Sequence, residues 1–126
     1  MQFNAVHHIA IIGSDYDKSR HFYVDMLNFK IIRENYRKEV GDYKIDLALG
    51  DIEIELFIKK DAPARESSPE ACGLRHLAFK VEDVDKTVAE LNALGIETEP
   101  VRLDTFTHRK MTFFRDPDNL PLEIHE

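Results

Sequence analysis

Cysteine and long apolar runs are scarce in this sequence, and each scarcity excludes a class of protein. Cys72 is the only cysteine among 126 residues, so an internal disulfide cannot form and a reducing compartment is expected. No apolar run approaches the roughly 20 residues that a membrane-spanning helix needs. No charged segment followed by an apolar core precedes Val6, so we expect no signal peptide and a cytoplasmic location.

Basic residues are outnumbered by acidic residues in this sequence. The chain carries 17 Lys and Arg against 24 Asp and Glu, for a net charge of -7. Nucleic acids and anionic membranes are bound by clustered basic residues, so we expect neither as a partner. The net charge leaves a small-molecule substrate open, even an anionic one, because a single site can be locally positive. The 43% hydrophobic composition and the length of one ordinary domain predict a folded chain with a core of its own.

Two segments of the chain resemble each other at a constant offset. The segment HHIAIIGSDYDK aligns without gaps with RHLAFKVEDVDK, and this alignment matches His8 with His76. The same offset places Glu55 on Glu123, near the end of each segment. Agreement at both ends predicts two related modules, at about residues 5–58 and 74–126, joined by a linker at residues 59–73.

Each module is predicted to fold as a strand, a helix and three further strands. In the first module, Asp15 or Asp17 is expected to cap a helix that runs to about Leu27. In the second module, an apolar stripe predicts a helix over residues 84–94 that Gly95 ends. Alternating and β-branched residues predict strands at 6–12, 29–36, 43–49, 52–58, 74–80, 97–102, 109–115 and 120–125.

Strand alternation places two histidines and two glutamates on equivalent faces. On the first strand of each module, apolar residues share one face, and His8 or His76 lies on the other. On the last strands, Glu55 and Glu123 likewise oppose apolar residues. Each of these residues alone is more often solvent-facing, but their pairing by one offset favours a shared site. Two imidazoles and two carboxylates suit Zn, Ni, Co, Mn or Fe(II) better than Ca or Mg, so we predict one divalent metal held by all four.

Other polar residues near these positions are weaker candidates. His7 is adjacent to His8 but is expected to point to the opposite face. Glu53 shares the face of Glu55, yet its partner in the repeat is Pro121. The sequence gives no reason to treat the remaining charged residues near the strands as anything but solvent-exposed side chains. These residues are Lys80, Lys110, Arg115 and His125.

Several motifs together resemble the glyoxalase I, bleomycin resistance and dioxygenase superfamily, also called the vicinal oxygen chelate (VOC) superfamily. They are HHIAII with SDYDKSRHFY, then IEIELF, LRHLAFKVEDVD and FFRDPDNLPLEI, and they cover nearly the whole chain. The segment SSPEACGLRHLAF resembles in particular the small bacterial glyoxalase-related proteins called YaeR-like. The resemblance implies one α+β domain over residues 1–126, in which two tandem βαβββ modules form an open, cup-shaped mixed β-sheet with the helices outside.

The resemblance also implies a chemistry. It carries the family's metal ligands onto His8, Glu55, His76 and Glu123, and this order of residue types looks most like glyoxalase I. It implies a lactoylglutathione lyase-like enzyme in which a divalent metal, Ni or Zn ahead of Co, Mn or Fe, stabilises an enediolate. A carboxylate then moves the proton, with Glu123 the expected base and Glu55 the second choice. Related bacterial glyoxalases imply a homodimer.

One departure from glyoxalase I bears on the substrate. Glyoxalase I follows its second ligand with an Asn and a Trp-Gly segment that helps hold glutathione, whereas Glu55 is followed here by LFIKKDAP. Lys59 stands where the Asn would be, so we expect little formation of lactoylglutathione. Three alternatives stay open: a metal-dependent epimerase or isomerase, an Fe(II) dioxygenase, and a non-catalytic small-molecule binding or resistance protein.

Overall fold

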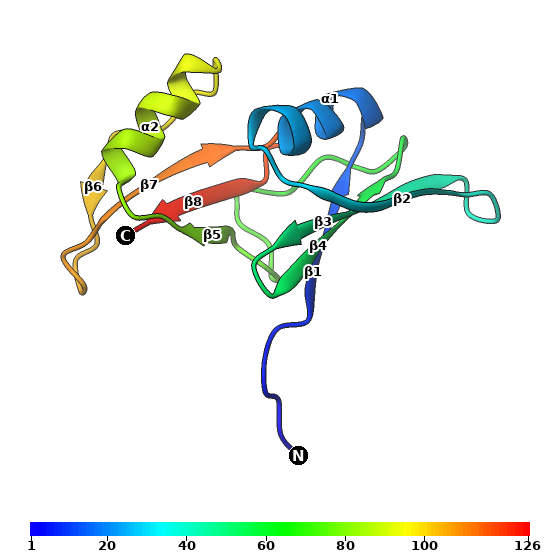
Figure 1. Cartoon of the computed structure of the whole chain (residues 1–126), viewed down its shortest axis with the longest axis horizontal. Coiled ribbons are helices and arrows are strands. Elements are labelled where there is room, and N and C mark those ends of the chain that lie inside the picture. The colour runs from blue at the N-terminus through cyan, green and yellow to red at the C-terminus, as the bar shows by residue number, and fades with distance from the viewer. The chain divides into compact units, whose positions relative to one another are not determined.

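The chain folds as two compact units, residues 1–63 and 64–126, in a computed structural model that describes all 126 residues. Each unit contains one strand, one helical segment and three further strands, in that order along the chain (Figure 1). This order confirms the predicted α+β fold of two tandem βαβββ modules. None of the helices combines the length and the apolar character that crossing a membrane requires.

The first unit begins its regular structure at β1 (His8–Gly13). Asp15 caps the helix that follows, because its carboxylate accepts a hydrogen bond of 2.9 Å from the backbone N–H of Lys18. Of the two predicted caps, Asp15 is therefore the one used. The remaining elements are α1 (Tyr16–Arg20), a π-helical continuation η1 (His21–Met26), β2 (Ile31–Arg37), β3 (Asp42–Leu49) and β4 (Ile52–Ile58).

The sheet of the first unit has the strand order β1-β4-β3-β2, with β1 parallel to β4 and the other pairs antiparallel. In the parallel pair, His8 lies opposite Glu53 and Ala10 lies opposite Glu55. Residues two apart on a strand point to the same face, so His8 and Glu55 are diagonal neighbours on one face of this sheet.

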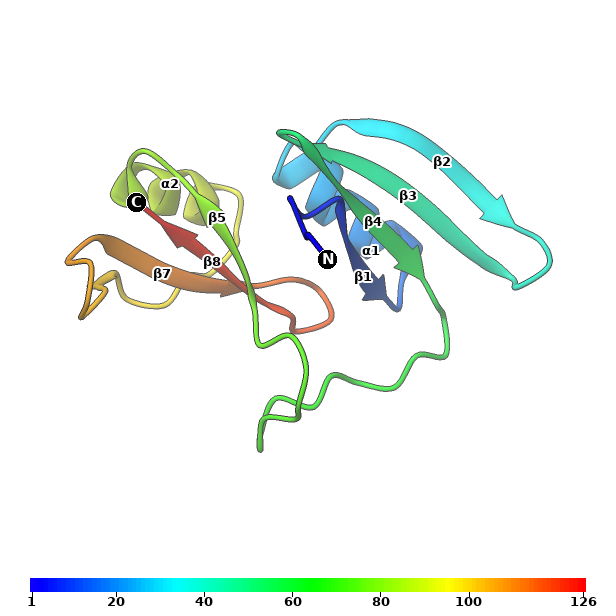
Figure 2. The ribbon, with the colours of Figure 1, turned by 90° about the horizontal axis from the view of Figure 1, so that it is seen from below.

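The opposite face of the same sheet is buried, as alternation predicts. Helix α1 lies along this sheet in both views (Figures 1 and 2). Tyr23, from the π-helical segment, is fully buried. The strands contribute residues that are at most 5% exposed: Ile11, Ile45, Leu47, Ile54 and Leu56. This apolar face fixes the register, since a slip of one residue would bury the charged face instead.

The second unit repeats the arrangement, with the strand order β5-β8-β7-β6 and β5 parallel to β8. Asp83 caps its helix through a 2.9 Å hydrogen bond from the backbone N–H of Lys86, and Gly95 follows the helix with φ +82°. Figure 2 shows this helix along one face of its own sheet. The elements are β5 (Leu77–Lys80), α2 (Val84–Ala93), β6 (Arg102–Leu103), β7 (Lys110–Arg115) and β8 (Pro121–His125).

One predicted strand is much shorter than expected. The strand expected over 97–102 is reduced to Arg102 and Leu103. Pro100 interrupts the segment because it has no backbone N–H to donate to a neighbouring strand. Around it, the backbone N–H of Glu99 still donates to the carbonyl of Phe113 at 2.8 Å. The hydroxyl of Thr112 donates to the carbonyl of Glu99 at 2.7 Å, so a side chain replaces one of the missing backbone hydrogen bonds between the strands.

Candidate metal centre

The second unit brings its predicted histidine and glutamate together. Nε2 of His76, just before β5, lies 2.9 Å from Oε2 of Glu123 on the neighbouring parallel strand β8. The side chain of Glu123 is only 8% exposed. Phe113 lies directly across the antiparallel pair from Glu123, and its ring meets the imidazole of His76 edge to face, with centroids 5.1 Å apart. Phe113 therefore packs against the imidazole of His76 and lies opposite Glu123 in the sheet.

The first unit brings its own pair together on the equivalent strands. Nε2 of His8 lies 3.5 Å from Oε2 of Glu55, and the Glu55 side chain is 17% exposed. On the other side of the ring, Nδ1 of His8 lies 2.8 Å from Nδ1 of His7, so one of these nitrogens donates to the other. A hydrogen bond at the far nitrogen is the usual way in which a ligating histidine is oriented.

The expectation that His7 points away from His8 was wrong. Strand β1 starts at His8, so alternation does not govern the residue before it. The two imidazole rings meet at an interplanar angle of 86° with centroids 5.1 Å apart. His7 is therefore a neighbour that orients His8 rather than a residue of the opposite face.

Both pairs fit the geometry of metal ligation. A divalent metal bound at about 2.1 Å to an imidazole nitrogen and a carboxylate oxygen holds those two atoms roughly 3.0 to 3.4 Å apart, for ligand angles from 90° to tetrahedral. The nitrogen–oxygen distances are 2.9 Å in the second unit and 3.5 Å in the first. Within each unit the predicted ligands are thus adjacent, with Nε2 facing Oε2 in both cases.

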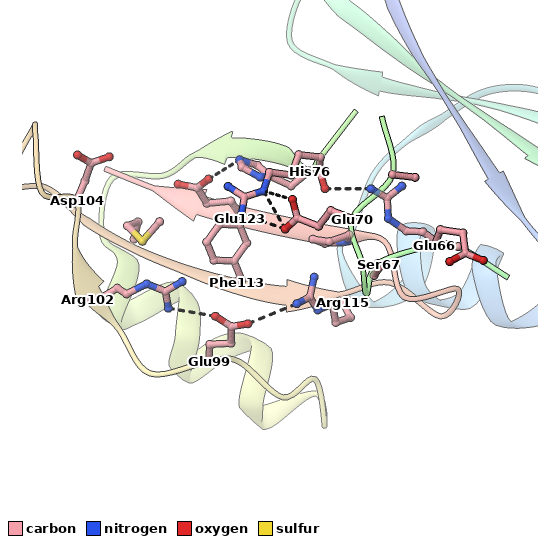
Figure 3. Close-up of a pocket in the computed structure, with 15 residues that line it drawn as sticks. Glu66, Ser67, Glu70, His76, Glu99, Arg102, Asp104, Phe113, Arg115 and Glu123 are labelled. Atoms are coloured by element: carbon pink, nitrogen blue, oxygen red, sulfur yellow. Dashed lines mark hydrogen bonds and ion pairs between the residues drawn. The ribbon is translucent and has the colours of Figure 1, made fainter. Parts of the chain in front are cut away.

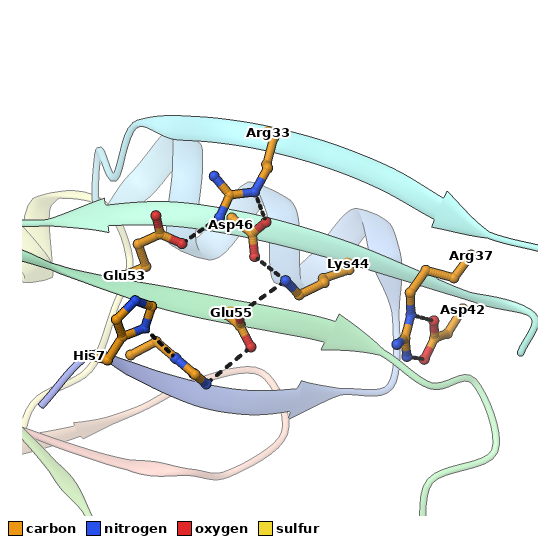
Figure 4. A network of polar contacts seen from close by, with 9 residues as sticks. His7, Arg33, Arg37, Asp42, Lys44, Asp46, Glu53 and Glu55 are labelled. Atoms are coloured by element: carbon orange, nitrogen blue, oxygen red, sulfur yellow. Dashed lines mark hydrogen bonds and ion pairs between the residues drawn. The ribbon is translucent and has the colours of Figure 1, made fainter.

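A chain of charged side chains surrounds Glu55 in the first unit (Figure 4). Nζ of Lys44 lies 3.0 Å from Oε1 of Glu55 and 3.1 Å from Oδ1 of Asp46. Asp46 is fully buried, and its second oxygen lies 2.7 Å from Nε of Arg33. The guanidinium of Arg33 also reaches Glu53 at 2.7 Å. Glu53, which the sequence offered as a rival ligand, is therefore already paired.

These contacts set the charge state of Glu55. The ammonium group of Lys44 donates to the carboxylate and holds the pKa of Glu55 below its usual range. The same contact raises the pKa of Lys44, because the carboxylate stabilises the protonated amine. Near neutral pH, Glu55 is therefore a carboxylate with one oxygen bound to a fixed cation.

The second unit has no counterpart of this charged chain around Glu123. The register of β3 against β4 places Asp46 opposite Glu55, whereas the register of β7 against β8 places Phe113 opposite Glu123. Two residues earlier, Lys44 is replaced in the same way by Met111. The two glutamates therefore occupy equivalent strands in different surroundings. Lys44 and Asp46 lie beside Glu55, whereas an aromatic ring lies opposite Glu123 in a cavity that also contains arginine side chains.

Lys59, the residue at which the sequence departs from glyoxalase I, is held by another ion pair. Its ammonium lies 2.9 Å from the carboxylate of Asp42. The two oxygens of Asp42 also accept hydrogen bonds of 2.6 Å from Nε and Nη2 of Arg37. Arg37 and Lys59 together hold the pKa of Asp42 far below its usual range. Arg37 lies over the ring of Phe57 at 4.8 Å. Lys59 thus belongs to a closed cluster at one end of the sheet.

A cavity of about 590 Å³ opens beside the histidine–glutamate pair of the second unit (Figure 3). His76 and Glu123 line it together with Phe113 and Met111. Its polar side includes Arg102 and Arg115, which lie 3.1 Å and 3.5 Å from the two carboxylate oxygens of Glu99. Of the weaker candidates, Arg115 is thus a cavity residue.

The other weaker candidates in this unit are held in separate contacts. Lys110 forms an ion pair with Asp85. His125 lies 2.7 Å from the carbonyl of Glu126 and 3.4 Å from Asp104, and the first of these contacts raises its pKa. Cys72, the single thiol, is exposed.

The charged residues next to Glu55 were not predicted from the sequence. Lys44 and Asp46 alternate with apolar residues on β3, so their position on the same face as Glu55 follows from strand periodicity. Their pairing with Arg33 depends on the register of β2 against β3, which includes an irregularity between Ile31 and Arg33. Such a bulge cannot be read from residue types alone.

The chain belongs to the Glyoxalase/Bleomycin resistance protein/Dioxygenase superfamily, whose sequence model matches residues 5–124. It is 57% identical to the YwkD protein of Bacillus subtilis (strain 168), over all of this chain and 99% of that one. It is 52% identical to the YaeR protein of Escherichia coli (strain K12), covering 96% of this chain and 95% of that one, which confirms the YaeR-like resemblance. The crystal structure of a glyoxalase family protein from Enterococcus faecalis is 57% identical, with a TM-score of 0.95 and full coverage of both chains.

Proposed function

We propose that this protein is a metal-dependent, glyoxalase-like lyase or isomerase whose single divalent metal is held by His8, Glu55, His76 and Glu123. The observation that carries the proposal is the repeated pair, with Nε2 and Oε2 separated by 3.5 Å in one module and 2.9 Å in the other. Membership of the superfamily, whose members typically bind a divalent metal, supports it. The mixed nitrogen and oxygen ligands favour Ni or Zn, with Co, Mn and Fe also suitable.

The chemistry follows from what each residue can do. When bound, a divalent metal supplies Lewis-acid stabilisation of the negative charge that develops on a substrate oxygen as a neighbouring C–H bond breaks. Glu123 accepts that proton and returns it to the adjacent carbon. Glu123 suits this role better than Glu55 because it lines the cavity and faces an apolar ring, whereas Lys44 binds one oxygen of Glu55.

The cavity supports a small substrate of mixed polarity. Phe113 and Met111 offer apolar contacts, and most of the remaining lining is polar or charged, including Arg115 and Arg102, which lies over the Phe113 ring at 5.2 Å. A cavity of about 590 Å³ suits a small oxygenated molecule, such as a carbonyl compound or its thiohemiacetal. Since Lys59 is paired with Asp42, it is not placed to act as the Asn that helps bind glutathione.

We further propose a cytoplasmic homodimer of one VOC domain per chain, covering residues 1–126. Each module supplies only two of the four ligands, so a complete metal site needs a first module beside a second. Strands β1 and β5 each lie at an edge of their sheet, and unpaired edges favour closed assemblies.

A thiol panel tests the proposed activity. Protein reconstituted with Ni or Zn is mixed with methylglyoxal and, in separate reactions, glutathione, other low-molecular-weight thiols or no thiol. We expect metal-dependent isomerisation, with glutathione a poor cosubstrate. Efficient turnover of the glutathione adduct would contradict the specificity proposed here.

The same preparation separates the three alternatives. Oxygen consumption with bound iron would favour the dioxygenase. Inversion of one stereocentre in another substrate, with exchange of its proton with solvent, would favour the epimerase. Tight ligand binding without turnover under any condition would favour the binding protein.

A further inference from the structure

We infer that Lys44 is a positioning residue that occupies one carboxylate oxygen of Glu55, so that only the other oxygen is presented towards the metal. This inference rests on the proposed metal function and deepens it. It concerns how the two equivalent glutamates, Glu55 and Glu123, come to play different parts.

The two oxygens of Glu55 have different neighbours. Oε1 lies 3.0 Å from Nζ of Lys44, while Oε2 lies 3.5 Å from Nε2 of His8. A charge-assisted hydrogen bond to a carboxylate is among the stronger contacts that a side chain makes, so it resists replacement. With Oε1 taken, the carboxylate is a one-oxygen ligand that faces the histidine of its own module.

Lys44 is itself held from the other side. Its ammonium also lies 3.1 Å from Asp46, a side chain with no exposed surface. Asp46 is fixed in turn by Arg33 at 2.7 Å, and the Lys44 ammonium lies 5.7 Å from the centroid of the Phe57 ring. A lysine side chain normally has many rotamers, and these contacts restrict it to one position.

Lys44 and Arg33 also neutralise a cluster of acidic groups. Oxygens of Asp46, Glu53 and Glu55 lie within 4.8 Å of one another, a spacing that a cation can bridge. Lys44 sits between Asp46 and Glu55, and Arg33 sits between Asp46 and Glu53. These internal cations leave the histidine side of Glu55 as the place where an added metal finds a carboxylate.

The second module shows what the site looks like without such a lysine. Met111 and Phe113 take the register positions of Lys44 and Asp46, and the Glu123 carboxylate faces His76 beside an aromatic ring. None of the ion pairs brings a lysine or arginine to Glu123, so both of its oxygens stay available for the metal and the proton, whereas Lys44 occupies one oxygen of Glu55. Lys44 thus makes Glu55 a fixed ligand and leaves the proton to Glu123.

Cobalt spectroscopy tests this inference without any assay of activity. Purified wild-type protein, Lys44→Met and Lys44→Arg are loaded with Co(II), and their visible absorption and bound cobalt are compared. Met is the residue that the second module carries at this position, and Arg retains the charge. We expect the wild type and Lys44→Arg to share one spectrum. Lys44→Met should bind the same amount of cobalt with weaker visible bands, because Glu55 gains a second oxygen for the ion and the coordination number rises.

The outcomes separate the inference from the proposed function. A Lys44→Met spectrum that superimposes on the wild-type spectrum would overturn the role of Lys44 and leave the metal site standing. A wild-type protein that binds no cobalt would overturn both. Lys44→Gln serves as a second neutral variant, with folding checked by circular dichroism. If neither neutral variant folds while Lys44→Arg does, Lys44 is a structural residue and the inference is wrong.

Discussion

Nε2 of His76 lies 2.9 Å from Oε2 of Glu123, across the parallel pairing of β5 with β8. The first module repeats the relationship between the same two atom types at 3.5 Å. An isolated histidine beside a glutamate is common on protein surfaces. We expect a pair repeated on equivalent strands of both modules, with Nε2 facing Oε2 each time, to serve the metal site proposed above.

Replacing Glu123 with glutamine should abolish catalysis and preserve the fold. An amide has nearly the same shape as the carboxylate but cannot accept a proton at neutral pH. Loss of a positioned general base typically lowers kcat by about 10² to 10⁴-fold. Activity and the thermal unfolding midpoint of Glu123→Gln are measured beside Glu97→Gln, an exposed glutamate outside the cavity, as the matched control.

The control should keep full activity. Full activity in Glu123→Gln itself would remove Glu123 from the proton transfer and would make Glu55 the next candidate. A large fall in the unfolding midpoint of Glu123→Gln would mean that the loss of activity reports on folding instead.

Asp42 should stabilise the fold in a pH-dependent way. Its pKa is lowered in the folded state by Arg37 and Lys59, so its contribution is present above the unfolded-state pKa of about 3.9. As the pH falls below that value towards the lower folded-state pKa, the contribution is progressively lost. Asp42→Asn should therefore unfold at a lower urea concentration than wild type at pH 7, and the difference should shrink by pH 3.

The matched control for Asp42 is Asp61→Asn, which removes an exposed carboxylate just after β4. It should leave the urea midpoint nearly unchanged at both pH values. An equal gap between Asp42→Asn and wild type at pH 7 and pH 3 would contradict the role of the ion pairs.

Much of this fold can be predicted from local sequence patterns. Strand β4 occupies the predicted residues 52–58, because alternation of apolar residues with Glu53, Glu55 and Phe57 has only one register that buries the apolar face. The cap at Asp15 and the stop at Gly95 follow from the hydrogen bonding of aspartate and the positive φ of glycine. The adjacency of each histidine to its glutamate follows from parallel pairing of the strand that begins at or just after the histidine with the strand that carries the glutamate.

Other features depend on contacts between distant segments and were not predictable in this way. The hydrogen bond between His7 and His8 depends on where β1 begins, which residue types do not define. The contact of Lys44 with Glu55 requires the register of β3 against β4. The shortened β6 reflects Pro100, whose effect on strand length was not anticipated.

Mixing two inactive variants tests whether sites are shared between chains. His8→Ala and His76→Ala each lose one ligand and should be inactive alone. If each metal site combines modules from two chains, unfolding and refolding the variants together rebuilds one intact site per heterodimer. We expect activity to reappear at up to about half the wild-type level per heterodimer. No recovery would place all four ligands of a site within one chain.

Metal content tests the central claim most directly. Protein purified without chelator, or stripped and then reconstituted, is analysed for Ni, Zn, Co, Mn and Fe beside His8→Ala and His76→Ala. We predict close to one divalent metal per wild-type chain, since each chain has one ligand set. In both histidine variants, loss of one ligand should lower metal content sharply. Wild-type protein that holds no metal after reconstitution, or histidine variants that hold as much as wild type, would contradict the metal centre proposed here.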